Sequence, residues 1–172
     1  MPEIQRTNLA NVVLLLKSLG VKDLTTFDFM DPPPQDNVAQ SLYQLWALGA
    51  VDDEGELTSL GRKMSEFPLD PPLSKMILVA EKLGCSADVA AIVSLLSVPQ
   101  VFFRPRGREQ EADAAREKMQ VPESDHLTLL NVLRLWERHG RRAAWAQEHF
   151  VHQKGLSRAS EVLGQLQDVM RQ

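Results

Sequence analysis

The chain has 172 residues, of which 44% are hydrophobic, and its 19 Lys and Arg against 23 Asp and Glu give a formal net charge of −4. This length suffices for one domain or two small ones with a real core. The single cysteine, Cys85, excludes an intrachain disulfide and a cysteine-rich zinc site, and the apolar runs are too short to span a membrane.

The charge is unevenly distributed along the chain. Residues 1–70 carry 5 Lys and Arg against 11 Asp and Glu, whereas residues 71–172 carry 14 against 12. A free-standing nucleic-acid binder typically has a basic face or a high isoelectric point. The composition therefore favours a chain that contributes one wall of a nucleic-acid site. Residues 1–20 lack the form of a signal peptide.

Two helices are predicted before residue 50. Apolar residues recur at three- and four-residue spacing over residues 4–20, and a second helix is expected over residues 36–49 with Asp36 as its cap. The prolines of residues 31–34 predict a rigid turn between the two helices. Because residues 36–49 contain no Lys or Arg, this unit is predicted to pack on protein instead of reading a DNA groove.

A β-hairpin and a short helix are predicted next. Residues 50–51 and 56–57 are apolar or extended in character and flank an acidic turn that contains Gly55. Thr58 is a natural helix cap, and the prolines from Pro68 to Pro72 are expected to stop the helix that it starts. Helix, hairpin and short helix in this order predict a winged-helix unit.

The remainder of the chain has a helical pattern. One helix is predicted over residues 73–83, and another follows Ser86 as its cap, apolar nearly all round and therefore expected to be buried. A shorter helix is predicted over residues 141–154, and the last helix is predicted from Ser157 onward.

Residues 101–120 are the most charged stretch. Arg104, Arg106 and Arg108 precede a helix that carries both signs of charge. The pattern fits a solvated surface helix with intrahelical ion pairs, such as Asp113 with Arg116. It also fits a basic rim that contacts phosphate, and composition alone favours the surface helix.

Another predicted helix begins near Ser124. Its hydroxyl can cap the helix, and His126 next to it can meet a ligand or have a structural role only. The buried stripe of this helix is predicted to contain Leu127, Leu130, Leu133 and Trp136.

No catalytic or metal-binding motif is evident. The chain lacks a phosphate-binding P-loop, a nucleophile elbow and a zinc-protease helix. His149 and His152 have a spacing that can ligate a metal, but no third ligand is evident beside them. The predicted fold is mostly α, with a winged helix and its small β-hairpin wing over residues 1–68 and a helical bundle over residues 69–172.

Several motifs resemble one family, the DEAH-box RNA helicases. GELTSLGRKMSEFPLDPPLSKM within residues 45–76 resembles the junction between the winged-helix and ratchet domains of these enzymes, and EIQRTNL at residues 3–9 resembles the entry into the winged helix. Residues 29–33, 97–105 and 124–128 match too, so the resemblance covers essentially the whole chain. Among the splicing members, GRE at residues 107–109 and VPESDH at residues 121–126 look most like the ATPase that remodels the spliceosome around the second catalytic step.

The resemblance implies a function for a larger protein. That protein would be a nuclear, ATP-dependent RNA helicase acting in pre-mRNA splicing, and its RecA domains, absent here, would bind ATP and Mg²⁺. This chain would be inactive alone. It would dock on the RecA and OB-fold domains and form part of a channel for single-stranded RNA, which it would bind weakly by itself.

The resemblance also implies site residues and partners. RNA contacts are expected from Arg104, Arg106, Arg108, Ser124 and His126, and no metal site is expected. Spliceosomal proteins are expected partners, and a G-patch activator is expected at an apolar patch near residues 24–46. The alternatives are a stand-alone interaction adaptor that uses its winged helix, and a DNA-binding winged-helix regulator, against which the acidic first half argues.

Overall fold

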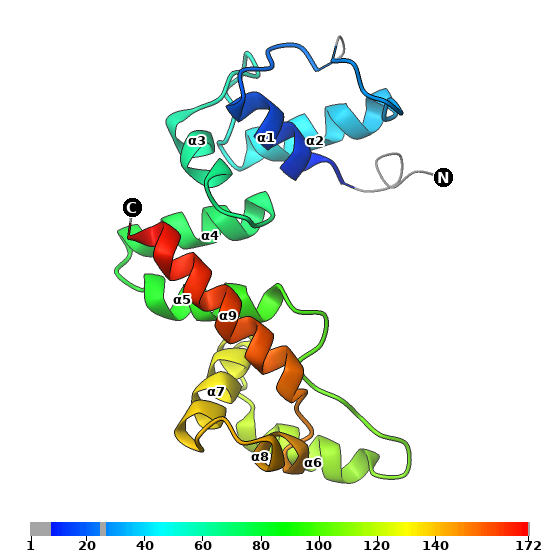
Figure 1. Cartoon of the computed structure of the whole chain (residues 1–172), viewed down its shortest axis with the longest axis vertical. Coiled ribbons are helices and arrows are strands. Elements are labelled where there is room, and N and C mark those ends of the chain that lie inside the picture. Colours follow the sequence, from blue (N-terminus) through cyan, green and yellow to red (C-terminus); the bar gives the residue numbers. More distant parts are fainter. Residues whose placement is uncertain (1–7, 25–26, 172) are drawn as a thin grey trace. The chain divides into compact units, whose positions relative to one another are not determined.

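The computed structural model of the chain describes residues 8–24 and 27–171, and most of this length is helical (Figure 1). The expected mostly-α fold is therefore confirmed. Contacts divide the chain into two compact units after Lys82, whereas the sequence motifs place the domain boundary after residue 68. The helices of the described residues are α1 (Ala10–Ser18), α2 (Gln35–Ala47), α3 (Ser59–Ser65), α4 (Pro71–Lys82), α5 (Ser86–Leu96), α6 (Glu109–Met119), α7 (Asp125–Arg138), α8 (Ala143–Glu148) and α9 (Gln153–Met170).

The first unit packs α1 against α2, α3 and α4, and α3 against α4. Each of these four helices contributes one side chain that is almost fully buried, namely Leu14, Leu45, Met64 and Ile77. Burial of such side chains from water is the main stabilising contribution to a small helical unit. The predicted start of the first helix falls partly on residues 1–7, which lie outside the described residues.

The wing is a minimal hairpin. Val51 and Leu57 form a single antiparallel bridge, and the amide of Thr58 donates to the carbonyl oxygen of Ala50 at 3.0 Å. Gly55 in the turn has φ +76°, a left-handed conformation that glycine adopts without strain. The predicted hairpin is thus present, but its strands are reduced to one bridge and its flanking hydrogen bonds.

Thr58 joins the wing to α3. Its Oγ1 accepts a hydrogen bond from the amide of Gly61 at 3.0 Å and donates to the carbonyl oxygen of Gly49 at 2.7 Å. The predicted helix cap is therefore confirmed, and the same hydroxyl also fixes the chain that enters the wing. Gly61 lies so close to the wing that a Cβ there would be 2.0 Å from the carbonyl oxygen of Ala50.

Three predicted helix boundaries were wrong. Pro71, expected to stop a helix, instead begins α4, because proline lacks only an N–H that the first turn leaves unpaired. The residue that caps α2 is Pro34, so Asp36 lies inside the first turn. Ser86 is the first residue of α5, and Cys85 occupies the capping position, where its side chain does not accept a capping hydrogen bond from the helix.

The second unit is built around α5, which contacts both α7 and α9. The helix is buried over residues 90–95, which confirms the prediction of a buried helix. Leu133 and Trp136 of α7 are buried as predicted, but Leu127 in its first turn is 45% exposed. None of the helices in the described ranges is long and apolar enough to cross a membrane.

The predicted helix over residues 141–154 is divided in two. α8 ends at Glu148, Phe150 takes a left-handed φ of +55°, and Val151 forms an antiparallel bridge with Phe102. α9 then begins at Gln153, before the predicted Ser157. The break arises because this short segment pairs with a chain segment far away in sequence, a partner that periodicity cannot reveal.

Candidate nucleic-acid interface

The segment that carries the three predicted arginines is anchored to the connection between α8 and α9. The amide of Phe103 donates to the carbonyl oxygen of Phe150 at 3.0 Å, and the amide of His152 donates to the carbonyl oxygen of Val101 at 2.8 Å. Gly155 in the first turn of α9 permits this approach, since a Cβ there would lie 2.9 Å from the carbonyl oxygen of Gln100. The arginines therefore start from a backbone that is fixed at residues 101–103.

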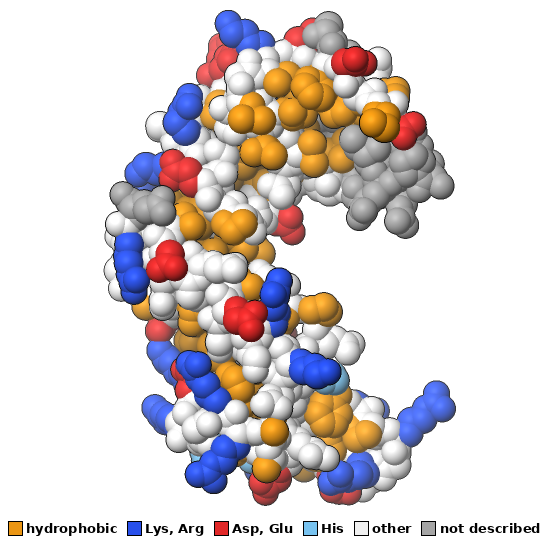
Figure 2. All heavy atoms as spheres, in the orientation of Figure 1, with side chains coloured by type: hydrophobic (Ala, Val, Ile, Leu, Met, Phe, Trp, Pro, Cys, Tyr) orange, Lys and Arg blue, Asp and Glu red, His pale blue; other side chains and the backbone are white. Residues whose placement is uncertain are grey.

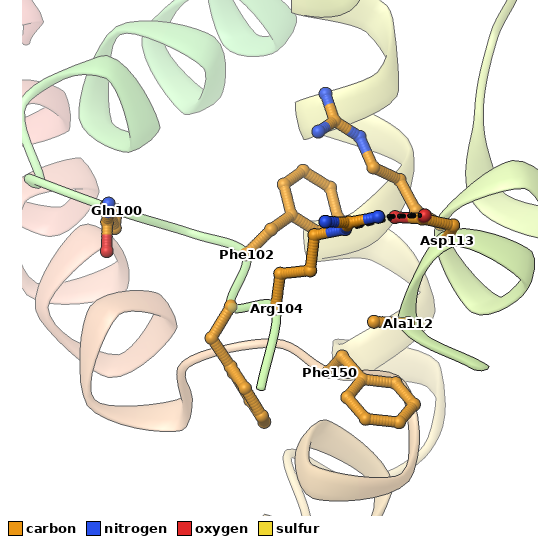
Figure 3. Close-up of a pocket in the computed structure, with 8 residues that line it drawn as sticks. Gln100, Phe102, Arg104, Ala112, Asp113 and Phe150 are labelled. Carbon is orange, nitrogen blue, oxygen red and sulfur yellow. Dashed lines mark hydrogen bonds and ion pairs between the residues drawn. The ribbon is translucent and has the colours of Figure 1, made fainter. Parts of the chain in front are cut away.

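A pocket of about 490 Å³ lies beside this segment (Figure 3). It combines aromatic rings with charged groups, contributed by the α5–α6 connection, by α6 and by the connection between α8 and α9. The lining residues are Gln100, Phe102, Phe103, Arg104, Ala112, Asp113, Arg116 and Phe150.

Arg104 and Asp113 form a two-point ion pair at this pocket. Nε of Arg104 donates to Oδ1 of Asp113 at 2.9 Å, and Nη2 donates to Oδ2 at 2.7 Å. The hydrogen bonds from Arg104 lower the pKa of the Asp113 carboxyl, and Asp113 in turn raises the pKa of the guanidinium. Both side chains remain more than half exposed, at 61% and 57%. Asp113 thus occupies one edge of the fork and leaves the outer edge open to a second oxyanion.

Two further arginines lie over aromatic rings in this region. The guanidinium carbon of Arg116 is 4.7 Å from the ring centre of Phe102, and that of Arg108 is 4.9 Å from the ring centre of Phe150. Arg108 also pairs with Glu111 at 2.7 Å, and this hydrogen bond lowers the pKa of the Glu111 carboxyl. Stacking on a ring limits the positions that an arginine side chain can take.

The structure separates the predicted site residues. Only Arg104 lines the pocket, while Arg108 touches it through Phe150. Arg106 is exposed in the turn before α6 and forms no ion pair with any described residue. Ser124 caps α7 by accepting from the amide of Leu127 at 3.3 Å, and His126 is exposed in the same turn. Neither Ser124 nor His126 lines the pocket.

Sequence reasoning missed part of this site. Asp113 was expected to pair with Arg116, but its partner is Arg104, nine residues before it. Phe102 and Arg116 were not among the predicted site residues. A signal for Phe102 does exist in the sequence, because two adjacent phenylalanines directly precede three arginines over residues 102–108. Aromatic rings next to cations are typical of surfaces that bind single-stranded nucleic acid.

The arrangement can bind anions. The open edge of Arg104, the free cation of Arg106 and the ring-supported Arg116 can each donate to phosphate oxygens. Across the described ranges, no three His, Cys, Asp or Glu side chains are grouped closely enough to hold a metal ion. Glu109, at the start of α6, has its carboxyl pKa lowered by backbone hydrogen bonds from its own amide and from that of Gly107.

Two family models match adjacent parts of the chain. Residues 41–69 match the winged-helix part of the helicase associated domain (HA2), and residues 70–129 match its ratchet-like part. The two matches together span more than half of the chain. The chain belongs to the helicase-associated HA2 family, as the resemblance in the sequence motifs predicted.

One curated relative is similar to the chain over nearly its whole length. The chain is 49% identical over 165 residues to the pre-mRNA-splicing factor ATP-dependent RNA helicase prp22 of Schizosaccharomyces pombe. The alignment covers 96% of this chain but only 14% of the relative. The chain therefore corresponds to a small part of the length of that helicase.

Proposed function

We propose that the chain is the winged-helix and ratchet region of a DEAH-box, ATP-dependent RNA helicase that remodels RNA–protein complexes in pre-mRNA splicing in the nucleus. The observation that carries this proposal is the 49% identity, over 96% of the chain, to a splicing RNA helicase. ATP and Mg²⁺ would bind to RecA domains outside this chain. The chain alone would not hydrolyse ATP, since its sequence holds no P-loop.

The role proposed for the second unit is to contact single-stranded RNA through its backbone. Arg104, Arg106 and Arg116 offer guanidinium donors at or near one pocket, and Phe102 and Phe103 offer ring faces there. Such a surface suits binding that depends on phosphate and tolerates any base sequence. Ser124 and His126, at the start of α7, remain candidates for a second contact.

The role proposed for the first unit is docking. It would pack on the RecA domains of the parent enzyme, with the OB-fold closing the RNA channel elsewhere. A groove of about 440 Å³ is available for an activator, such as the helix of a G-patch protein, and it is lined by Leu24, Phe27, Phe29, Pro32, Pro33, Gln35, Val38, Ala39 and Leu42. Figure 2 displays hydrophobic side chains gathered on the face of this unit.

The same groove supports the second candidate function, a stand-alone adaptor that binds a partner helix. The two functions differ in what the parent reading frame encodes. A helicase requires phosphate-binding and DEAH motifs upstream of this region, whereas an adaptor does not.

RNA-stimulated ATP hydrolysis by the protein that carries this chain tests the proposal. Arg104→Ala should weaken the stimulation by raising the RNA concentration needed for half-maximal activity. Arg158→Ala is the matched control, because Arg158 is an exposed arginine in an ion pair with Glu161, away from the pocket. A parent protein whose ATPase does not respond to RNA would contradict the helicase assignment, and equal activity of the two variants would contradict the site.

A further inference from the structure

Two large aromatic side chains are exposed near the end of α2. Tyr43 is 67% exposed and Trp46 is 47% exposed, and their ring centres are 5.7 Å apart. They lie one helical turn apart, so they present a joint surface. Aromatic residues exposed in this way are typical anchors of protein interfaces.

One wing carboxylate, that of Asp53, borders this aromatic surface, and two more follow it in the wing. Nε1 of Trp46 donates to Oδ1 of Asp53 at 2.7 Å, which fixes the turn of the wing against the indole ring. Glu54 and Glu56 follow in the same turn and are exposed. Asp53, Glu54 and Glu56 form no ion pair with any residue that the structure describes. These three carboxylates, with Tyr43 and Trp46, are named the aromatic–acidic patch.

The surrounding sequence offers these carboxylates little compensating charge. Residues 23–61 contain eight Asp and Glu and no Lys, Arg or His. Lys75 approaches the end of α2, where its Nζ donates to the carbonyl oxygen of Leu48 at 2.9 Å, and it is not paired with the wing. A ligand that brings its own cation is therefore complementary to the patch.

We infer that the aromatic–acidic patch binds an arginine-bearing peptide segment of a partner protein. A guanidinium group is planar, so it can stack on the ring of Tyr43 or Trp46 while its edge donates to a wing carboxylate. A lysine ammonium lacks the flat face and the two-donor edge of a guanidinium, so it fits the patch less well, and the phosphates of RNA are repelled by the wing. The inference concerns a surface other than the groove proposed for an activator helix, and it stands independently of the helicase assignment.

The test uses the 172-residue chain and a blocked Gly-Arg-Gly-Arg-Gly peptide. Binding is followed by the NMR signal of the Trp46 indole N–H, which is assigned by its loss in Trp46→Phe. The arginine peptide should shift this signal in a saturable way. The same peptide with lysine in place of arginine should bind more weakly, and the same peptide with neutral citrulline in place of arginine should leave the signal unchanged. Equal effects of the arginine and citrulline peptides would overturn the inference.

Two variants separate the contributions of the rings and the charges. Tyr43→Ser and the double variant Glu54→Gln/Glu56→Gln should each weaken binding of the arginine peptide about threefold to tenfold. The control is Glu81→Gln/Glu148→Gln, which removes the same number of exposed carboxylates elsewhere and should bind as the unaltered chain does. An equal loss in the control would mean that net charge alone attracts the peptide, and it would overturn the inference. If a single-stranded oligouridylate shifts the Trp46 indole signal and the arginine peptide does not, the inference is also overturned.

Discussion

Arg104 and Asp113 are joined by two parallel hydrogen bonds, of 2.9 Å and 2.7 Å, which connect the α5–α6 segment to α6 across the rim of the pocket. The predicted basic rim therefore contains its own counter-ion. An exposed ion pair of this kind contributes little to stability, so a phosphate can compete with the carboxylate at modest cost. The pair decides how much of the Arg104 charge is available to RNA.

The basic rim should make RNA binding sensitive to salt. In the variant Arg104→Ala/Arg106→Ala/Arg108→Ala, we expect weaker binding of single-stranded RNA and a shallower dependence on salt. The slope of log affinity against log salt should fall by up to about 2, because each lost phosphate contact accounts for about 0.7 with a single strand. Fluorescence anisotropy of a labelled oligonucleotide at low and moderate salt measures both quantities. The control is Arg138→Ala/Arg158→Ala/Arg171→Ala, and an equal loss there would show that the site was misplaced.

Asp113→Asn should strengthen RNA binding. The substitution removes the carboxylate that engages Arg104 and keeps the size of the side chain, so the guanidinium becomes free to bind phosphate. We expect a gain in affinity of about twofold to fivefold, in line with the modest strength of exposed ion pairs.

The matched control for Asp113→Asn is Glu117→Gln, which removes one exposed negative charge from the same helix without touching Arg104. A gain of the same size in this control would mean that overall charge is responsible. Weaker binding in Asp113→Asn would mean instead that Asp113 orients Arg104 for RNA.

The Arg104–Asp113 pair should also contribute a pH-dependent stability. The pKa of Asp113 is lowered in the folded chain by the hydrogen bonds from Arg104. A carboxyl whose pKa is lowered on folding stabilises the fold at pH values above its pKa in the unfolded chain, which is about 3.9 for Asp. This contribution is lost as the pH falls through the pKa of the folded chain. Urea denaturation should therefore show Asp113→Asn to be less stable than the unaltered chain near neutral pH, with the difference shrinking below about pH 4. In an Arg104→Ala background this difference should be much smaller, since only the charge of Arg116 then lowers the pKa of Asp113, and its persistence at full size would refute the assigned cause.

Gly61 and Gly164 are a matched pair of helical glycines with opposite expected outcomes. Gly61→Ala would place a Cβ 2.0 Å from the carbonyl oxygen of Ala50 and 2.8 Å from Cδ1 of Leu57, so the wing would have to separate from α3. We expect a loss of more than about 2 kcal/mol in the free energy of unfolding. Gly164→Ala meets nothing within 4 Å and should stabilise α9 by about 0.5–1 kcal/mol. Thermal or urea unfolding measures both, and similar effects of the two substitutions would contradict the close contact at Gly61.

Features that depend on neighbouring residues could be predicted from the sequence. Thr58 and Ser124 cap helices as expected, because a hydroxyl at that position reaches an amide only three residues away. The buried nature of α5 followed from its apolar character on nearly all sides. The family, too, was evident from motifs that are continuous in sequence.

Features that join distant segments could not be predicted in this way. The break between α8 and α9 exists because Val151 pairs with Phe102, and no feature of the sequence near Val151 indicates that partner. Leu127 fits the apolar period of α7, yet it is exposed because none of the elements that the structure describes covers its side chain at the start of that helix.

The sequence by itself determined most of the helices, the caps at Thr58 and Ser124, the winged-helix and ratchet order and the family, because these follow from periodicity and from contacts between near neighbours. Only the tertiary structure decided which arginines are free to act. Arg104 and Arg108 are paired with acids of α6, while Arg106 has no ion-pair partner among the described residues. The physical reason is that the strength of an ion pair depends on distance in space, which the order of residues along the chain does not specify.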